Sequence, residues 1–124
     1  MTNILEKIIT DKKDSIKKYK DFFAIEYLNK KISSYKKYLD FKAKLMEKKV
    51  SVIAEIKKAS PSAGIIIQNY DPKIIAKQYL DSGATCLSVL TEEKHFQGQL
   101  EHIKEIKEEV KLPVLCKDFF IDPY

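Results

Sequence analysis

Arginine is absent from this chain of 124 residues, which also has only two cysteines, three glycines and four prolines. No apolar run approaches the roughly 20 residues that a membrane-spanning helix needs. The amino terminus carries acidic residues and lacks the apolar core of a signal peptide. The two cysteines form no CxxC pair, so neither a disulfide framework nor a cysteine metal cage is expected. We therefore expect a cytoplasmic protein with reduced thiols and no membrane partner.

The net charge of +5 is unevenly distributed along the chain. Residues 1–50 carry fourteen lysines and seven acidic residues, whereas residues 51–124 carry nine lysines and eleven acidic residues. Without arginine, the basic part lacks the planar guanidinium that reads guanine edges or binds a phosphate through two hydrogen bonds. The composition therefore disfavours nucleic acid as a partner, and solvated lysine faces on helices explain the charge.

Residues 1–49 are predicted to be a helical extension. Apolar residues recur at helical spacing over residues 4–19, and Asn3 and Glu6 occupy the positions of a capping box. This pattern predicts an amphipathic helix with a lysine-rich outer face.

A second helix is expected further along this extension. After a less regular stretch at residues 21–29, Ser33 or Ser34 is placed to cap a helix that continues to Met46. This helix also has a lysine-rich face, which we interpret as exposed to solvent.

From residue 50 onward, short β-branched segments alternate with helical patterns. Asp71 and Pro72 are a helix start signal, and Gly83 is a stop signal. The first strand is nearly continuous in apolar residues, as in a strand buried on both faces. The order β-α-β-α-β requires parallel strands with right-handed crossovers, which predicts α/β structure. The expected strands are 52–56, 84–90 and 114–117, and the expected helices are 72–82 and 100–111.

The start signal of Asp71 and Pro72 recurs at Asp122 and Pro123. We therefore expect residues 50–124 to be the first part of a larger α/β protein, truncated before a third helix. Three parallel strands with two helices leave the outer strands unpaired and one face uncovered. We expect such a sheet to bind a missing carboxyl-terminal half, or to self-associate through its open strand edges.

Charged side chains occupy the predicted carboxyl ends of the strands, where ligands of parallel α/β proteins bind. Glu55 and Lys57 alternate at the end of the first strand, and Lys117 ends the third. Such a cluster suits an anionic substrate and proton transfer, because a partly apolar pocket can tune the acidity of a lysine. The alternative interpretation is an internal ion pair that closes the core.

The segment 59–64 offers hydroxyl groups and backbone amides that could contact a phosphate, although small-residue loops often only turn the chain. P-loop and GxGxxG motifs are absent. His95 and His102 have no metal-ligand spacing to Cys86 or Cys116. We therefore expect neither a metal nor a cofactor.

Four segments stand out when the sequence is read in order: 54–62 (AEIKKASPS), 88–92 (SVLTE), 96–98 (FQG) and 114–119 (VLCKDF). Together they resemble the indole-3-glycerol phosphate synthase family. The similarity covers about residues 1–124 and is strongest from Val50 onward. The resemblance implies a (β/α)₈ TIM barrel with an N-terminal helical extension. It also implies conversion of 1-(2-carboxyphenylamino)-1-deoxyribulose 5-phosphate to indole-3-glycerol phosphate, with loss of carbon dioxide and water, in tryptophan biosynthesis.

The resemblance also implies roles for individual residues. Lys117 would be the general acid that protonates the substrate ketone as the ring closes, and Lys57 would hold the anionic substrate. Glu55 would orient a lysine and stabilise developing positive charge. The residues implied to bind the substrate are Ser60 at the phosphate, with Leu90, Phe96 and Phe119 as apolar walls for the anthranilate ring.

Two other functions remain open at this point. Another phosphate-binding barrel enzyme, such as phosphoribosylanthranilate isomerase, would share the order of strands and helices. A lysine-rich interaction module would instead bind its partner through the N-terminal helices. Gln99 and His95 depart from the resembled family, which usually has serine and an aromatic residue there.

Overall fold

The computed structural model describes residues 3–124. Residues up to Tyr38, together with Phe119–Tyr124, form one compact unit, and Leu39–Asp118 form the other. The predicted division between a helical extension (residues 1–49) and the first part of the α/β protein (residues 50–124) stays a prediction. Within the described residues, no helix is long and apolar enough to cross a membrane.

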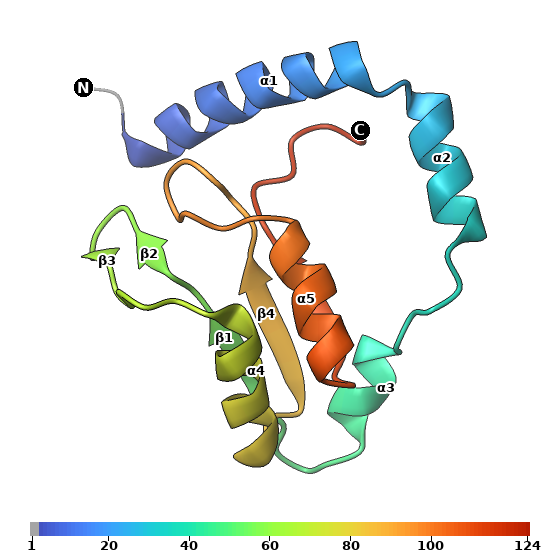
Figure 1. The fold of residues 1–124 in the computed structure, drawn as a ribbon, viewed down its shortest axis with the longest axis vertical. Coiled ribbons are helices and arrows are strands. Elements are labelled where there is room, and N and C mark those ends of the chain that lie inside the picture. Colours follow the sequence, from blue (N-terminus) through green and yellow to red (C-terminus); the bar gives the residue numbers. More distant parts are fainter. Residues whose placement is uncertain (1–2) are drawn as a thin grey trace. The chain divides into compact units, whose positions relative to one another are not determined.

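The first unit contains α1 (Ile4–Phe22) and α2 (Ile25–Ser34) (Figure 1). The predicted capping box is confirmed. The Glu6 N–H donates to the Asn3 side chain at 2.9 Å, and the Asn3 N–H donates to the Glu6 carboxylate at 3.3 Å. Two amide donors that the first turn leaves unpaired are thereby satisfied.

The segment Phe119–Tyr124 contacts the end of α1 within the same unit. The Tyr124 hydroxyl lies 2.9 Å from the Tyr19 carbonyl and 2.7 Å from the Phe23 carbonyl, at the carboxyl end of the helix. Lys20 forms an ion pair with Asp122 at 2.8 Å. The hydrogen bond from Lys20, with that from the Tyr124 N–H, lowers the pKa of Asp122.

The prediction that Ser33 or Ser34 begins a helix is wrong. Ser34 is the last residue of α2, and α3 (Phe41–Met46) begins seven residues later, directly after Asp40. The Ser34 hydroxyl donates to the Lys31 carbonyl at 2.9 Å, whereas the Asp40 carboxylate accepts an amide hydrogen bond in the first turn of α3. A serine hydroxyl can serve a helix end as well as a helix start, so its position alone is ambiguous.

The second unit is built around a parallel sheet in the order β1-β4-β5, as the β-α-β-α-β pattern predicted. Its strands are β1 (Ile53–Ile56), β4 (Cys86–Leu90) and β5 (Val114–Lys117). The connections contain α4 (Pro72–Asp81) and α5 (Glu101–Glu109). The signals around α4 act as expected: Asp71 caps its start, and Gly83 follows its end at φ +89°.

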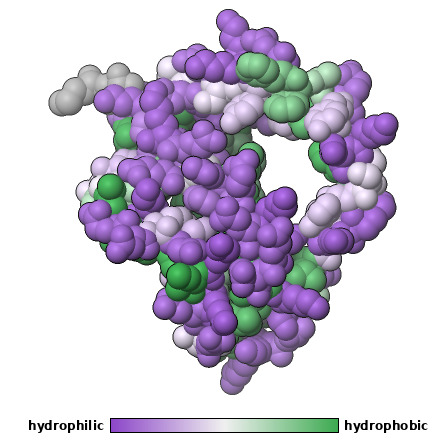
Figure 2. Space-filling model, viewed as in Figure 1, coloured by the Kyte–Doolittle hydropathy of each residue, from purple (hydrophilic) through white to green (hydrophobic). Residues whose placement is uncertain are grey.

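Helices α4 and α5 contact each other, and they contact β1 and β5 respectively. The hydrophobic core lies between these helices and the sheet. The polar side of α5 forms part of the purple, hydrophilic surface in Figure 2. The buried members of the core are Ile56, Ala76, Leu87, Val89, Ile106, Val110 and Leu112.

The opposite face of the sheet is not covered along the outer strands. Strand β4 is buried throughout, but Ile53 on β1 and Leu115 on β5 are each 46% exposed. The expectation that the first strand is buried on both faces is therefore wrong for this structure. The physical reason is that α4 and α5 both pack against the same face, so alternate residues of an outer strand remain exposed.

Residues after β1 form a short antiparallel hairpin where the sequence predicts a loop. It consists of β2 (Ala59–Ser60) and β3 (Gly64–Ile65). Gly64 adopts φ +64°, a conformation that glycine adopts without a side-chain clash. The hairpin gives Ser60 a defined backbone position next to the carboxyl end of β1.

Candidate functional site

Strand alternation places the charged cluster on the face opposite the helices. Ile56 belongs to the helix-facing core, so Glu55 points to the other face of β1. On β5, Val114 packs against the same core, so Leu115 and Lys117 point away from it. The sheet therefore presents carboxylate and ammonium groups at the carboxyl ends of its outer strands.

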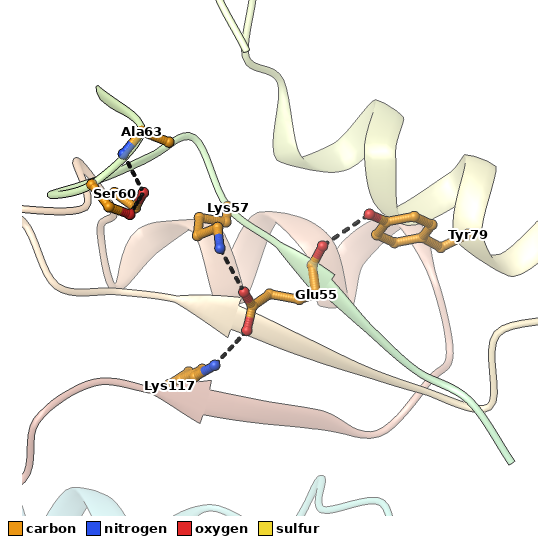
Figure 3. Close-up of polar contacts among 7 residues, drawn as sticks. Glu55, Lys57, Ser60, Ala63, Tyr79 and Lys117 are labelled. Carbon is orange, nitrogen blue, oxygen red and sulfur yellow. Dashed lines mark hydrogen bonds and ion pairs between the residues drawn. The ribbon is translucent and has the colours of Figure 1, made fainter. Parts of the chain in front are cut away.

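Glu55 joins the two predicted lysines, as Figure 3 shows. One carboxylate oxygen lies 3.2 Å from Lys57 Nζ, and the other lies 2.5 Å from Lys117 Nζ. The side chains are 31% exposed at Glu55, 33% at Lys57 and 52% at Lys117, so Lys117 has the most access to solvent. The cluster can therefore bind an anion and exchange protons with it.

The electrostatics of the cluster favour an ionised Glu55. Partial burial acts to raise the pKa of Glu55, but hydrogen bonds from Lys117 and Lys57 and their positive charges outweigh burial and lower it. Near neutral pH, the carboxylate is an acceptor for both ammonium groups. It can orient a lysine whose other N–H groups face a ligand.

The backbone of Glu55 is held from the helical side. The Tyr79 hydroxyl on α4 donates to the Glu55 carbonyl at 2.9 Å (Figure 3). Tyr79 lies within the helix predicted for residues 72–82, and a tyrosine at helical spacing does not reveal which carbonyl its hydroxyl reaches. This hydrogen bond links the helix-covered core to the residue at the centre of the cluster.

Thr91 connects the carboxyl ends of β4 and β5. Its N–H donates to the Lys117 carbonyl at 3.0 Å, and its hydroxyl donates to the Asp118 carboxylate at 3.0 Å. Thr91 is only 2% exposed, so these hydrogen bonds are shielded from water. They constrain the backbone of Lys117 and thus the direction of its side chain.

Glu92 organises the loop that follows β4. Its carboxylate accepts backbone hydrogen bonds from Lys94 at 3.2 Å, His95 at 2.7 Å and Phe96 at 2.9 Å, and the residue is only 3% exposed. No sequence motif predicts this role of Glu92. An acidic residue directly after a buried strand was the available signal, because it can bind the amide groups of a following turn.

A close backbone approach completes this loop. A Cβ atom added at Gly98 would lie 2.3 Å from the Leu90 carbonyl oxygen, far inside normal contact distance. The Gly98 N–H also donates to the Glu92 carbonyl at 2.8 Å. Glycine is therefore required where the loop passes the end of β4.

The model of the indole-3-glycerol phosphate synthase family matches residues 5–124. The chain belongs to the indole-3-glycerol phosphate synthase family. Its curated relatives include proteins named indole-3-glycerol phosphate synthase from Trichodesmium erythraeum (strain IMS101), 48% identical, and Microcystis aeruginosa (strain NIES-843 / IAM M-2473), 44% identical. Each match covers 98% of this chain and 42% of the relative.

The family has the TIM-barrel fold, and the parallel β1-β4-β5 sheet with its two helices is consistent with part of such a barrel. The predicted fold class is therefore confirmed. The chain spans less than half the length of the curated relatives that it matches. Neither the isomerase nor the lysine-rich module gains support from these comparisons.

The structure places the four residues implied to bind substrate in different settings. Ser60 accepts a hydrogen bond from the Ala63 N–H at 3.2 Å within the hairpin (Figure 3). Leu90, only 3% exposed, is the register partner of Lys117. Phe96 is half-buried in the loop held by Glu92. Phe119 is also half-buried and belongs to the unit that contains α1 and α2. Their substrate contacts stay predictions.

Across residues 3–124, no group of three or more His, Cys, Asp or Glu side chains is arranged to hold a metal ion. Cys86 and Cys116 are free cysteines. Burial raises the pKa of the Cys86 thiol, which favours its neutral form. Cys86 thus behaves as a packing residue on β4.

Proposed function

We propose that this chain is the amino-terminal part of an indole-3-glycerol phosphate synthase, a lyase that forms the indole ring. The observation that carries the proposal is the cluster of Glu55, Lys57 and Lys117 at the carboxyl ends of parallel strands, in a chain that belongs to this family. The proposed substrate is 1-(2-carboxyphenylamino)-1-deoxyribulose 5-phosphate, a phosphorylated carboxylate. Its negative charges match two ammonium groups.

Lys117 is proposed as the general acid. As the ring carbon attacks the substrate ketone, the ketone oxygen gains negative charge and accepts a proton from the lysine ammonium. Lys117 is the most exposed of the three groups, and Thr91 constrains its backbone. These features support a donor that can reach a substrate from a defined starting point.

Lys57 and Glu55 are proposed to prepare the substrate and the acid. Lys57 binds an anionic group of the substrate, while Glu55 orients a lysine and stabilises the positive charge that develops during ring closure. The ion pairs of Glu55 with both lysines support this division of roles. A carboxylate between two ammonium groups also reduces their mutual repulsion.

The remaining proposed contacts surround this centre. Ser60 binds the phosphate, and Leu90, Phe96 and Phe119 form apolar walls around the anthranilate ring. The buried position of Leu90 beside Lys117 in the strand register supports its assignment. Residues 1–49 are proposed to act as the helical extension of the barrel.

Further strands are proposed to pair with β1 and β5. Each of these strands has one neighbour in the described sheet, and a closed barrel leaves no strand edge unpaired. The partner is either the carboxyl-terminal part of a barrel or another copy of this chain. Light scattering on the purified chain, with and without the separately expressed remainder of the Trichodesmium relative, measures which association occurs.

The activity test uses the same two components. We expect indole-3-glycerol phosphate, detected by its fluorescence, only when the chain and the remainder of the Trichodesmium relative are combined. Lys117→Ala should abolish turnover with much less effect on KM, because a proton donor acts mainly in the transition state. Lys57→Ala should impair both kcat and KM, because an ammonium that binds the substrate acts in both states.

Lys58→Ala is the matched control, because it removes the side chain of the lysine next to Lys57. The backbone carbonyl of Lys58, which accepts hydrogen bonds from the N–H groups of Ile66 and Ile67, is kept in this variant. The variant should retain activity. If Lys117→Ala changed KM alone, the proposed acid would be wrong. A Lys57→Ala variant with unaltered KM would instead support a purely structural ion pair.

A further inference from the structure

Ser88 on β4 carries a buried hydroxyl whose role the cluster described above does not include. The residue is 5% exposed, and its Oγ atom has no hydrogen-bond partner among residues 3–124. An unpaired buried hydroxyl is unfavourable, because folding removes its hydrogen bonds to water without replacing them. Its position therefore calls for an explanation.

The strand register places Ser88 directly beside the cluster. Glu55 on β1 pairs with Ser88, and Ser88 pairs with Leu115 on β5. The neighbouring residues of Ser88, Leu87 and Val89, both belong to the helix-facing core, so the Ser88 side chain points to the same face as Glu55. These two side chains are therefore adjacent on one surface of the sheet.

The Glu55–Lys117 ion pair crosses the strand that carries Ser88. Its partners lie on β1 and β5, and β4 runs between those strands. Lys117 is in register with Leu90, two residues beyond Ser88. The ion pair thus passes over the face of β4 near Ser88, so the serine lies beside Glu55 but makes no hydrogen bond while Lys117 occupies the carboxylate.

We propose that Ser88 is a positioning residue that donates a hydrogen bond to Glu55 when Lys117 leaves the carboxylate for a ligand. The inference rests on the proposed function only in naming an anionic substrate as that ligand. Once Lys117 moves away, one oxygen of Glu55 loses its donor, and the Ser88 hydroxyl can rotate to replace it. Glu55 then stays ionised and oriented while Lys117 acts elsewhere.

The surrounding contacts favour this exchange. Tyr79 holds the Glu55 carbonyl at 2.9 Å, so the backbone of Glu55 is fixed when its side-chain partners change. The Lys117 side chain is 52% exposed, so solvent or a ligand can reach it. The Ser88 hydroxyl, which would replace the Lys117 ammonium at Glu55, lies on β4, and this strand is buried along its whole length.

The test compares four forms of the chain: unchanged, Ser88→Ala, Lys117→Met and the double variant. Lys117→Met removes the ammonium but keeps a long apolar stem, and so represents the state in which Lys117 has left Glu55. The pKa of Glu55 is read in each form from the NMR titration of its carboxyl carbon, which is assigned with Glu55→Gln.

We expect Ser88→Ala to leave the pKa of Glu55 unchanged while Lys117 is present. In the Lys117→Met background, the same substitution should raise that pKa, because no hydroxyl then stabilises the carboxylate. An equal or absent effect of Ser88→Ala in both backgrounds would overturn the proposal. A packing role for Ser88 would not depend on Lys117.

Cys86→Ala is the matched control, because Cys86 lies on the same face of β4, two residues before Ser88, and is fully buried. It should not change the pKa of Glu55 in either background. Ser88→Cys provides a second variant of similar size with a weaker donor. In the Lys117→Met background, the pKa of Glu55 in this variant should fall between its values in the serine and alanine forms. If self-association hides the signal, the same forms are combined with the remainder of the Trichodesmium relative.

The titration is separate from the assay of the proposed function. Product formation could fail while the Ser88 effect appears, which would leave the positioning role intact and reject the activity. Conversely, turnover without the background-dependent pKa change would retain the activity and reject the role of Ser88.

Discussion

The two faces of the β1-β4-β5 sheet are made from alternate residues of the same strands, yet they have opposite character. Leu87 and Val89 on the helix-facing side are fully buried in an apolar core. Glu55 and Lys117 on the other side form an ion pair that is partly open to solvent. The difference shows that packing against α4 and α5 stabilises one face, while the other face keeps its charged side chains accessible to a ligand.

Removal of a core side chain should have the largest effect on this comparison. Leu87→Ala is expected to lower the free energy of unfolding by about 2–5 kcal/mol, because it removes buried apolar contacts and leaves a cavity. Leu115→Ala, at a residue 46% exposed on the other face, should lower it by less than about 1.5 kcal/mol. Urea unfolding followed by circular dichroism measures both. Equal losses would contradict the proposed division between the faces.

The loop after β4 allows a second comparison. Gly98→Ala is expected to lower the free energy of unfolding by about 3 kcal/mol, because the added methyl group overlaps the Leu90 backbone. The neighbouring Gln97 has φ +53°, so Gln97→Gly should not lower it. Thermal unfolding of the two variants separates overlap from general loop sensitivity, and a stable Gly98→Ala variant would argue against the close approach.

The hydrogen bonds of Thr91 test how the buried strand supports the charged face. Thr91→Val should lower the free energy of unfolding by about 2 kcal/mol, because it removes the hydroxyl that binds Asp118. Thr91→Ser keeps that hydroxyl and should lower it by about 1 kcal/mol through the lost methyl group. Urea unfolding gives these values. A larger loss in Thr91→Ser would indicate that packing, rather than the hydroxyl, matters at this position.

Acidification should have the smallest effect. The pKa of Glu55 is lowered from 4.5 in the folded chain, so its contribution to stability is present above that value and is lost as pH falls through the folded pKa. Exposed ion pairs contribute little, so we expect less than about 1 kcal/mol. Unfolding measured from pH 7 to pH 3 should show a weaker pH dependence in Glu55→Gln than in the unchanged chain.

Lys44→Gln is the control for that titration, because Lys44 forms an exposed i,i+3 ion pair with Glu47. Its loss should not remove the part of the pH dependence that belongs to Glu55. Identical curves for Glu55→Gln and the unchanged chain would show that the cluster makes no measurable contribution to folding.

Local signals made several parts of the structure predictable. Asp71, Pro72 and Gly83 act within a few residues of their own positions, so the bounds of α4 followed from the sequence. The serine signal predicted for the second helix failed, because the Ser34 hydroxyl donates to the Lys31 carbonyl at the end of α2 instead of starting a new helix. Short polar side chains are ambiguous when neighbouring donors and acceptors compete for them.

Sequence patterns alone predict the order of the parallel strands and the helices that connect them, and also the alternation that puts Glu55 and Lys57 on one side of a strand. Periodicity and capping are local properties, so they can be read without coordinates. Three features depend on tertiary structure: the ion pair of Lys117 with Glu55, the hydrogen bonds that hold the backbones of these two residues, and the position of Ser88 beside Glu55. These contacts join residues far apart along the chain, and their geometry depends on strand register and helix packing, which no local pattern specifies.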